Sequence, residues 1–403
     1  MWGTQRVTVN VLGLYNFQSK GSGSGKGGGA SKGKGGGKQY SINAQFGLCQ
    51  GPVSIGPTNL VWSNSGVQYA GSVPLNFYGG ADGQPPDPTF ASTSPNVPVI
   101  GYSGTCYATG TPLQLGNSPV LPNVSAELVG FFQGTAGSNS LVSPDASPAL
   151  ILQDALSNPR YGAGYPASGP GALDPDDLAV YTNYCTGNLI GFSLIMDKQQ
   201  PMSSWVEELA TVSVSAVFFS SGRLRVVPYS ATIATNSDTT YTPDLTPRYQ
   251  LSDADYQTQG GGRRAVGDPD PVIITRTDVS QLVNWMTIEI MDRNNWYDPA
   301  IQPPLFDQAA IDLYGFKSQS SVQAHEICNP TVAYNVAALM LKRKLYMRNT
   351  YKFRLGSEYM LLEPMDIVGL TDSVSGLFQH SVRIAEIQED DNGVLSITAE
   401  DLA

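Results

Sequence analysis

RVTVNVLGLY (6–15) and QYSINAQFGLC (39–49) are two strand-like stretches near the start of the sequence. They flank a segment rich in glycine and lysine, KGSGSGKGGGASKGKGGGK (20–38). Both stretches alternate apolar and polar side chains with a period of two, which predicts two half-buried strands. A hairpin needs only about two to five residues to turn. The connection between these strands is far longer, so we expect it to do more than reverse the chain.

This connection holds ten glycines and five lysines, in a chain whose formal net charge is −11. A glycine-rich coil of this length has an end-to-end dimension of about 25 Å. Two interpretations stay open: a cationic arm that reaches an acidic partner, and a solvated loop. Residues 23–28 fit GxGxxG and residues 28–35 nearly fit a Walker loop, but Gly35 stands where Ser or Thr is needed and no helix is predicted to follow. Nucleotide binding is therefore not favoured. The lysines are Lys20, Lys26, Lys32, Lys34 and Lys38.

The composition is typical of a β-rich protein with many turns and long ordered loops. Of the 403 residues 41% are hydrophobic and only 14% are charged, with 43 glycines and 28 prolines. The five lysines contribute +5, which leaves −16 for the rest. Such an acidic body argues against nucleic-acid binding as the main task. The sequence shows no signal-peptide pattern and no apolar run long enough to cross a bilayer, so we expect synthesis in the cytoplasm and no membrane anchor.

The elements along the chain predict an α+β organisation. Helices are expected from Pro148, capped by Ser147, over the segment from Asp174 to Gly187, and after a cap at Ser203 or Ser204. LIGFSLIMD (189–197) is predicted as a strand and VFFSSGRLRVVPYS (217–230) as a hairpin. The longest helix is expected over 331–349, and Tyr359 to Leu362 are expected in a strand. We therefore predict a β-rich domain at 1–150, a small α+β domain at 151–235 and a third domain at 236–403.

Residues that could carry catalysis are sparse. The only histidines are His325 and His380, neither of which lies in a GxSxG pattern, and His325 is interpreted as a satisfied structural residue. The four cysteines are more than fifty positions apart, so no local metal site is expected and buried free thiols are favoured. Three acidic pairs could in principle serve a glycosidase, but nothing selects one of them. We expect no catalytic residues, no cofactor and no metal. The pairs are Asp176/Asp177, Glu207/Glu208 and Asp390/Asp391.

A basic stretch, LKRKLYMRNTYKFR (341–354), covers the end of the expected long helix and continues beyond it. It holds six basic residues. One interpretation is a nucleic-acid patch. The favoured one is a set of charged heads that pair with the acidic body or with a partner. The candidate interface residues are Lys342, Arg343, Lys344 and Arg348.

Several stretches, taken together and in order, resemble the phage tail-tip or baseplate-hub proteins, including the host-specificity-type protein of gene transfer agents and the lambda-type tail-tip protein. The resemblance covers most of the chain, although none of the pieces is a catalytic signature. They are GLCQGPV (47–53), LGNSPVLPNVSAELVG (115–130), DALSNPRYGAGYP (154–166), DKQQPMSSWVEELATVSVSAVFFSSGRLRVVPY (197–229), DQAAIDLYG (307–315), QAHEICNP (323–330), LYMRNTYKFRLGSEYMLLEPMDIVGLTD (345–372) and VRIAEIQEDDNGVLSITAE (382–400).

The resemblance implies a structural virion protein that closes the distal end of the tail tube as a homotrimer. It implies tail-tube-like β-barrel domains, with residues 236–403 completing such a domain together with N-terminal strands. The implied partners are the tail tube or distal tail protein, the tape-measure protein, and fibre or spike proteins. Genomic DNA would pass only as transient cargo, and an acidic channel wall would let it slide. The lysine arm would then meet the lumen or a neighbouring subunit. The alternatives are a tail-associated cell-wall hydrolase and a receptor-binding adhesin.

Overall fold

The computed structural model describes residues 1–21, 38–56, 58–64, 66–69, 75–94, 96–136, 143–237, 239–258 and 270–402. The chain forms two compact units. The first comprises Met1–Gln133, Pro144–Ala146 and Ser193–Asp197, and the second takes the remaining residues. The further division at residue 235 that the sequence suggested stays a prediction.

The first unit is built from two sheets of antiparallel strands, with the orders β2-β3-β8-β7 and β1-β9-β5-β6; β4 also pairs with β9. Within the described residues both orders are open, so each sheet has free edges. The elements are β1 (Thr4–Thr8), β2 (Asn10–Gly21), β3 (Lys38–Gln50), β4 (Ser54–Ile55), β5 (Leu60–Ser63), β6 (Gly66–Tyr69), β7 (Asn76–Tyr78), α1 (Pro88–Thr93), β8 (Thr105–Gly116) and β9 (Val124–Val129).

One apolar core is shared by the two sheets of this unit. β1 continues almost directly into β2, so a single segment supplies an edge strand to each sheet, and the Val9 amide still donates to the Val124 carbonyl at 3.2 Å. The buried side chains come from strands of both sheets, which fixes the faces that point inward. They include Val7, Ile42, Ala44, Phe46, Val61, Ala108, Val124, Ala126 and Leu128.

Two short pieces from later in the chain complete the first unit. The Ser193 hydroxyl accepts a hydrogen bond from the Thr4 amide at 3.0 Å and donates to the Asp145 carboxylate at 2.7 Å. All three residues are fully buried, so these hydrogen bonds satisfy polar groups that are shielded from water. The Trp2 amide likewise donates to the Leu194 carbonyl at 3.0 Å.

The second unit starts with the helical part that the sequence predicted. α2 (Pro148–Ser157) begins after Ser147, whose side chain makes no capping hydrogen bond, and α3 (Pro175–Gly187) begins after Asp174, whose carboxylate accepts from two amides of the first turn. The hairpin of β10 (Ser215–Ser220) and β11 (Arg223–Pro228) turns at Ser221-Gly222, as predicted. α4 (Met202–Val212) buries Trp205 and Leu209, but it begins after Pro201, so the predicted caps Ser203 and Ser204 were wrong.

Two of the predicted strands are absent from the described structure. Residues 189–197 lack a strand ladder: Leu189 has a left-handed backbone (φ 55°), and the Ile190 amide donates locally to Cys185 at 2.8 Å. Their apolar side chains are mostly buried all the same, which is what the pattern reported. Tyr359 ends a 3₁₀ segment (Ser357–Tyr359), and Met360 and Leu361, in the turn that follows it, are exposed.

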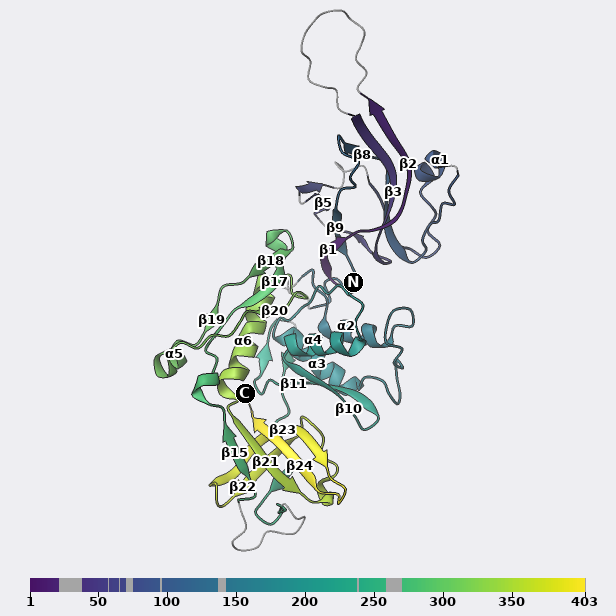
Figure 1. Cartoon of the computed structure of the whole chain (residues 1–403). Coiled ribbons are helices and arrows are strands. Elements are labelled where there is room, and N and C mark those ends of the chain that lie inside the picture. Colours follow the sequence, from purple (N-terminus) through teal and green to yellow (C-terminus); the bar gives the residue numbers. More distant parts are fainter. Residues whose placement is uncertain are drawn as a thin grey trace, which may run out of the picture. The chain divides into compact units, whose positions relative to one another are not determined.

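The middle of the second unit consists of short elements around the longest helix, α6 (Pro330–Tyr346) (Figure 1). The predicted helix is therefore present but ends three residues early, because β21 begins at Asn349. The Asn329 side chain caps α6 by accepting from the Thr331 amide at 2.9 Å. The short elements are β12 (Ala234–Thr235), β13 (Thr240–Tyr241), β16 (Trp285–Met286), β17 (Ile288–Asp292), β18 (Asp298–Ile301), β19 (Leu305–Phe306), α5 (Gln308–Tyr314) and β20 (Val322–Gln323).

A six-stranded mixed sheet closes the second unit, with the order β14-β22-β23-β24-β21-β15 and one parallel pair, β14 with β22. In β21 the side chains of Tyr351, Phe353 and Leu355 are buried between exposed or half-buried neighbours. The yellow strands β23 and β24 lie side by side in Figure 1, joined by a turn at Asn392-Gly393 as predicted. The strands are β14 (Tyr249–Leu251), β15 (Ile273–Arg276), β21 (Asn349–Leu355), β22 (Ile367–Asp372), β23 (Leu377–Glu389) and β24 (Leu395–Asp401).

An ion network connects the hairpin to α3 and to the turn before β22. Arg225 binds Asp177 with Nη2 at 3.0 Å and with Nε, and it binds Glu363 with Nη1 at 3.0 Å. Ser220 donates to the same Glu363 carboxylate at 2.9 Å. Because the side chains are half-buried and the arginine fork is fully used, this network restrains the hairpin more than a single exposed ion pair would.

Candidate functional site

The predicted basic residues lie on the last turns of α6 and just after it. Arg343 and Lys344 stand in the final turn, where a positive charge interacts favourably with the carbonyl end of the helix. Consecutive positions on a helix point in different directions, so these side chains reach different parts of the second unit.

Arg343 reaches the residue that follows β11. Its guanidinium carbon lies 3.3 Å from the ring centre of Tyr229, and Nη2 lies 3.2 Å from Oε1 of Glu400. The Tyr229 backbone is itself fixed, because its amide donates to the Val214 carbonyl at 3.0 Å. Arg343 therefore ties the helix to β11 and to β24 at once.

Arg383 approaches the same tyrosine. Its guanidinium carbon lies 5.9 Å from the ring centre of Tyr229, and Nη1 donates to the Tyr229 carbonyl. Only 4% of Arg383 is exposed, and its direct cross-strand partner is Glu400. Burial lowers the pKa of Arg383, and the Glu400 carboxylate opposes that shift. One carboxylate thus serves two arginines. Tyr229, Arg343, Arg383 and Glu400 are called the arginine cluster below.

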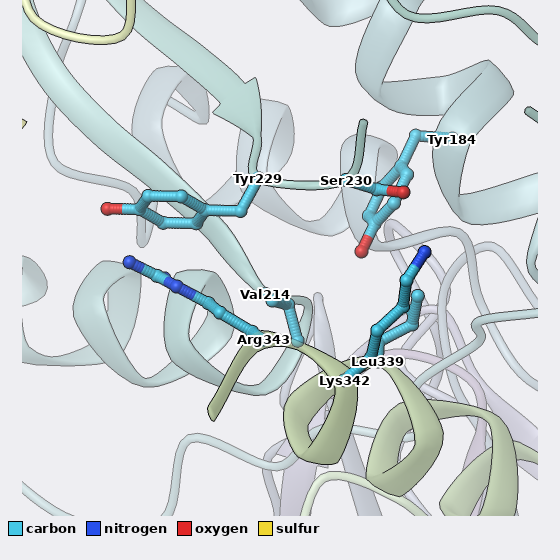
Figure 2. A pocket seen from close by; sticks show the side chains of 7 residues that line it. All are labelled: Tyr184, Val214, Tyr229, Ser230, Leu339, Lys342 and Arg343. Carbon is cyan, nitrogen blue, oxygen red and sulfur yellow. The ribbon is translucent and has the colours of Figure 1, made fainter. Parts of the chain in front are cut away.

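A small hollow lies beside this cluster. Figure 2 shows Arg343 pointing toward the Tyr229 ring, and Lys342 directed toward Ser230 and Tyr184. The Lys342 ammonium donates to the Thr232 hydroxyl at 3.2 Å. The hollow has room for about one water molecule. It is lined by Tyr184, Val214, Tyr229, Ser230, Leu339, Lys342 and Arg343.

The two remaining basic candidates reach the region of α5. Lys344 donates to the Gln319 side chain at 2.5 Å, and Arg348 donates to the Tyr314 hydroxyl at 3.1 Å while its guanidinium carbon lies 5.0 Å from that ring centre. All four basic candidates therefore contact groups of this chain, but in these contacts only Arg343 meets an acidic side chain, whereas the other three meet hydroxyl, amide or phenol groups. A contact of theirs with another protein stays a prediction.

The lysines of the glycine-rich segment are described only at its ends. Lys20 and Lys38 lie at the far end of the hairpin formed by β2 and β3, and both are exposed. Lys26, Lys32 and Lys34 fall outside the described residues.

The same hairpin shows a surface that the sequence pattern did not reveal. β2 is an edge strand of its sheet, and it carries four large apolar side chains that are 40–52% exposed: Val11, Leu12, Leu14 and Phe17. The prediction of a half-buried strand is right for Val7 in β1 and wrong for β2. An exposed apolar edge strand is typical of a surface that pairs with another chain.

Both histidines lie within hydrogen-bond distance of a carboxylate, Glu289 for His325 and Asp401 for His380. His325 Nε2 lies 2.8 Å from Glu289 Oε1. His380 Nε2 lies 2.9 Å from the Tyr351 hydroxyl, which also donates to Asp401 at 2.8 Å. Within the described ranges, no three His, Cys, Asp or Glu side chains converge as metal ligands. The same residues contain no helix that is both long enough and apolar enough to span a bilayer.

Two members of the acidic pairs, Asp177 and Asp390, take part in local structure. Asp177 binds Arg225, and the Asp390 carboxylate accepts from the Asn392 and Val394 amides at 2.9 and 3.0 Å in the turn between β23 and β24. The acid that the sequence did not single out is Glu326, beside His325. Burial, with a smaller effect of the Glu208 charge, raises the pKa of Glu326 to about 7. Neither burial nor the distant Glu208 could be inferred from the local sequence.

The arginine cluster predicts a specific stability effect at Tyr229. Replacing it by Leu keeps an apolar side chain but removes the π face, and we expect a loss of about 1–2 kcal/mol in the free energy of unfolding. Tyr229→Phe keeps the ring and is the matched control, expected to change that value by less than about 0.5 kcal/mol. Urea unfolding followed by circular dichroism measures both. Equal losses in the two variants would contradict a role for the arginine–ring contacts.

Glu326 predicts a pH-dependent effect. A carboxyl whose folded pKa is raised destabilises the fold once it ionises, so the penalty is absent below about pH 4.5 and grows until about pH 7. Glu326→Gln should therefore be more stable than the wild type by up to about 3 kcal/mol at pH 8 and equal to it at pH 4. Urea midpoints at both pH values test this. Glu208→Gln should shift stability in the same direction by less, and a pH-independent difference for Glu326→Gln would contradict the assignment.

Comparison with known proteins supports the tail-protein part of the resemblance. Residues 201–387, a little under half of the chain, match the family model described as "Putative phage tail protein". No curated protein matches the sequence.

Among solved structures, a chain of the "Virion of native gene transfer agent (GTA) particle" is similar over 100% of this chain and 83% of that one, with 17% identity and a TM-score of 0.60. The prophage tail protein gp18 from Listeria monocytogenes EGD-e covers 90% of this chain and 84% of its own (11% identity, TM-score 0.33). The 43 kDa tail protein of prophage MuSo2 from Shewanella oneidensis covers 99% and 94% (11%, 0.37). Residues 201–387 thus carry the sequence pattern of a phage tail family, and the chain has the fold of a gene transfer agent virion chain.

Proposed function

We propose that this chain is a structural, non-enzymatic virion protein that forms the central hub at the distal end of a phage-type tail. The observation that carries the proposal is the likeness to a gene transfer agent virion chain, because it spans the whole of this chain rather than one domain. The family match over residues 201–387 points to the same class of particle by sequence.

The contacts of the charged side chains fit a structural role. The arginine cluster and the network of Arg225 with Asp177 and Glu363 connect segments that are distant in sequence. A hub transmits load between the tube above and the fibres or spike below, and such crosslinks between sheets and helices keep its parts in fixed register.

Assembly as a homotrimer would use the exposed edge of the first unit. A neighbouring strand paired with β2 would satisfy its free backbone groups and cover Val11, Leu12, Leu14 and Phe17. Three such contacts would extend the open sheets toward the tube-like barrel ring that the resemblance implies. The tape-measure protein would lie inside this ring, the tail tube or distal tail protein above it, and DNA would pass through without stable binding. Lys20 and Lys38, the described lysines of the glycine-rich segment, lie at the end of the same hairpin.

The direct test is a cryo-EM reconstruction of the distal tail of intact particles, with symmetry relaxed to threefold. The expected result is three copies of this chain around the axis below the tube. Absence of the chain from the tip, or its presence at the ends of the fibres, would overturn the hub proposal and turn attention to receptor binding or wall hydrolysis.

A pair of variants tests the assembly edge separately. Val11→Lys combined with Leu14→Lys places two charges on exposed positions of β2, so we expect a folded protein with the wild-type circular dichroism spectrum but a loss of trimers in analytical ultracentrifugation. Val120→Lys is the matched control, since Val120 is 69% exposed and lies outside the strands. Wild-type trimers in the double variant would exclude β2 as the contact.

A further inference from the structure

Two cysteines of the first unit lie opposite each other, near the end of β3 and the start of β8. Cys49 on β3 and Cys106 on β8 are direct partners in the antiparallel register, although they are far apart in sequence. Paired residues in an antiparallel ladder have Cα atoms about 4.5–5.5 Å apart and side chains on the same face. That spacing lies within the Cα range of about 4.4–6.8 Å in which a disulfide can form.

The surroundings of the two sulfur atoms differ. Cys106 is 2% exposed and belongs to the apolar core, whereas Cys49 is only partly buried and packs against that core. The hydrogen bond between the two thiols lowers the pKa of Cys49 and raises that of Cys106. The thiolate is the reactive form of a cysteine, so Cys49 is both the more accessible and the more reactive member.

We infer that Cys49 and Cys106 form a reversible cross-strand disulfide, with Cys49 as the thiol that first attacks a small disulfide such as oxidised glutathione. The other two cysteines offer no such arrangement. Cys185 and Cys328 are buried in the second unit, and burial raises the pKa of Cys185.

The chemistry proceeds by two exchanges. The Cys49 thiolate attacks one sulfur of oxidised glutathione, which breaks its S–S bond, forms a mixed disulfide and releases one glutathione thiolate. That thiolate takes up a proton as Cys106 loses its own, and the Cys106 sulfur then attacks the Cys49 sulfur. The second glutathione leaves. Two protein thiols are oxidised to one disulfide, and one glutathione disulfide is reduced to two thiols.

The bond would link the two central strands of the sheet β2-β3-β8-β7. It closes a long loop of chain, and a crosslink that closes a longer loop removes more conformational entropy from the unfolded state. If the proposed function holds, the chain leaves a reducing cytoplasm within a particle, and the first unit would become locked outside the cell. The chemistry itself does not rest on that function.

The test uses the purified full-length protein, prepared reduced and incubated with oxidised glutathione at pH 8 without denaturant. We expect two of the four thiols to be lost, a single peptide pair linking Cys49 to Cys106 in mass spectrometry, and an upward shift of the urea midpoint that dithiothreitol reverses. Retention of all four thiols, a stable glutathione adduct, or a crosslink between other cysteines would overturn the inference. These outcomes do not depend on whether the chain assembles into tails.

Single variants test the order of the two steps. Cys106→Ala should accumulate the mixed disulfide on Cys49, because no second thiol can resolve it. Cys49→Ala should keep the Cys106 thiol reduced. Cys185→Ser is the control in the other unit and should oxidise like the wild type. If Cys106 in the Cys49→Ala variant reacts with glutathione as fully as Cys49 does in the Cys106→Ala variant, Cys49 is not the preferred attacking thiol and the proposed order of steps is wrong.

Discussion

The second unit depends on how one buried positive charge is accommodated. Arg383 is almost fully buried in the six-stranded sheet, and an unpaired charge there would cost several kcal/mol. Its guanidinium donates to the Tyr229 carbonyl, and the charge of Glu400 on the adjacent strand favours its charged form. Because Arg343 binds the same carboxylate and the same aromatic ring, the positions of α6, β11, β23 and β24 are all constrained by these four side chains.

The arginine cluster contributes more to the specificity of the fold than to its free energy of unfolding. Apolar side chains could fill the same space at little cost, but they would tolerate several registers between strands and helix. A carboxylate that lies close to two guanidinium groups is compatible with very few registers between the strands and the helix. The network around Arg225 applies the same constraint to the hairpin of β10 and β11, because Glu363 is reached from both Arg225 and Ser220. For the proposed hub, a fixed register would matter more than a few additional kcal/mol of stability.

The sequence predicted those parts of the fold that depend on local chemistry. Ser147 before Pro148, Asp174 before Pro175 and the turn at Ser221-Gly222 appear where their signals placed them, since caps and turns are decided by neighbouring residues. Leu189 to Asp197 show the limit of this reasoning. The apolar pattern reported burial correctly, but a strand also needs a partner strand, and none pairs with these residues in the described structure.

The candidate site was predicted even less completely. The basic residues at 342–348 could be named from the sequence. Their partners could not, because Tyr229 and Glu400, which contact Arg343, lie more than fifty positions away on either side. The exposure of Val11 and Leu14 follows from the edge position of β2, which a period-two pattern does not encode. The facing of Cys49 and Cys106 required the register of β3 and β8, and no spacing rule gives that.

The hydrogen bonds of Ser193 have a consequence for synthesis on the ribosome. Strands β1 to β9 emerge first, but the hydrogen bonds that join Thr4 and Asp145 to the Ser193 hydroxyl cannot form until residue 193 has left the exit tunnel. By then α2 and α3 of the second unit have already been made. In vectorial folding from the N-terminus, one domain finishes folding before the next is synthesised. The first unit of this chain cannot fold completely in that way. That unit must wait, partly assembled, for a piece of chain that arrives about sixty residues after β9.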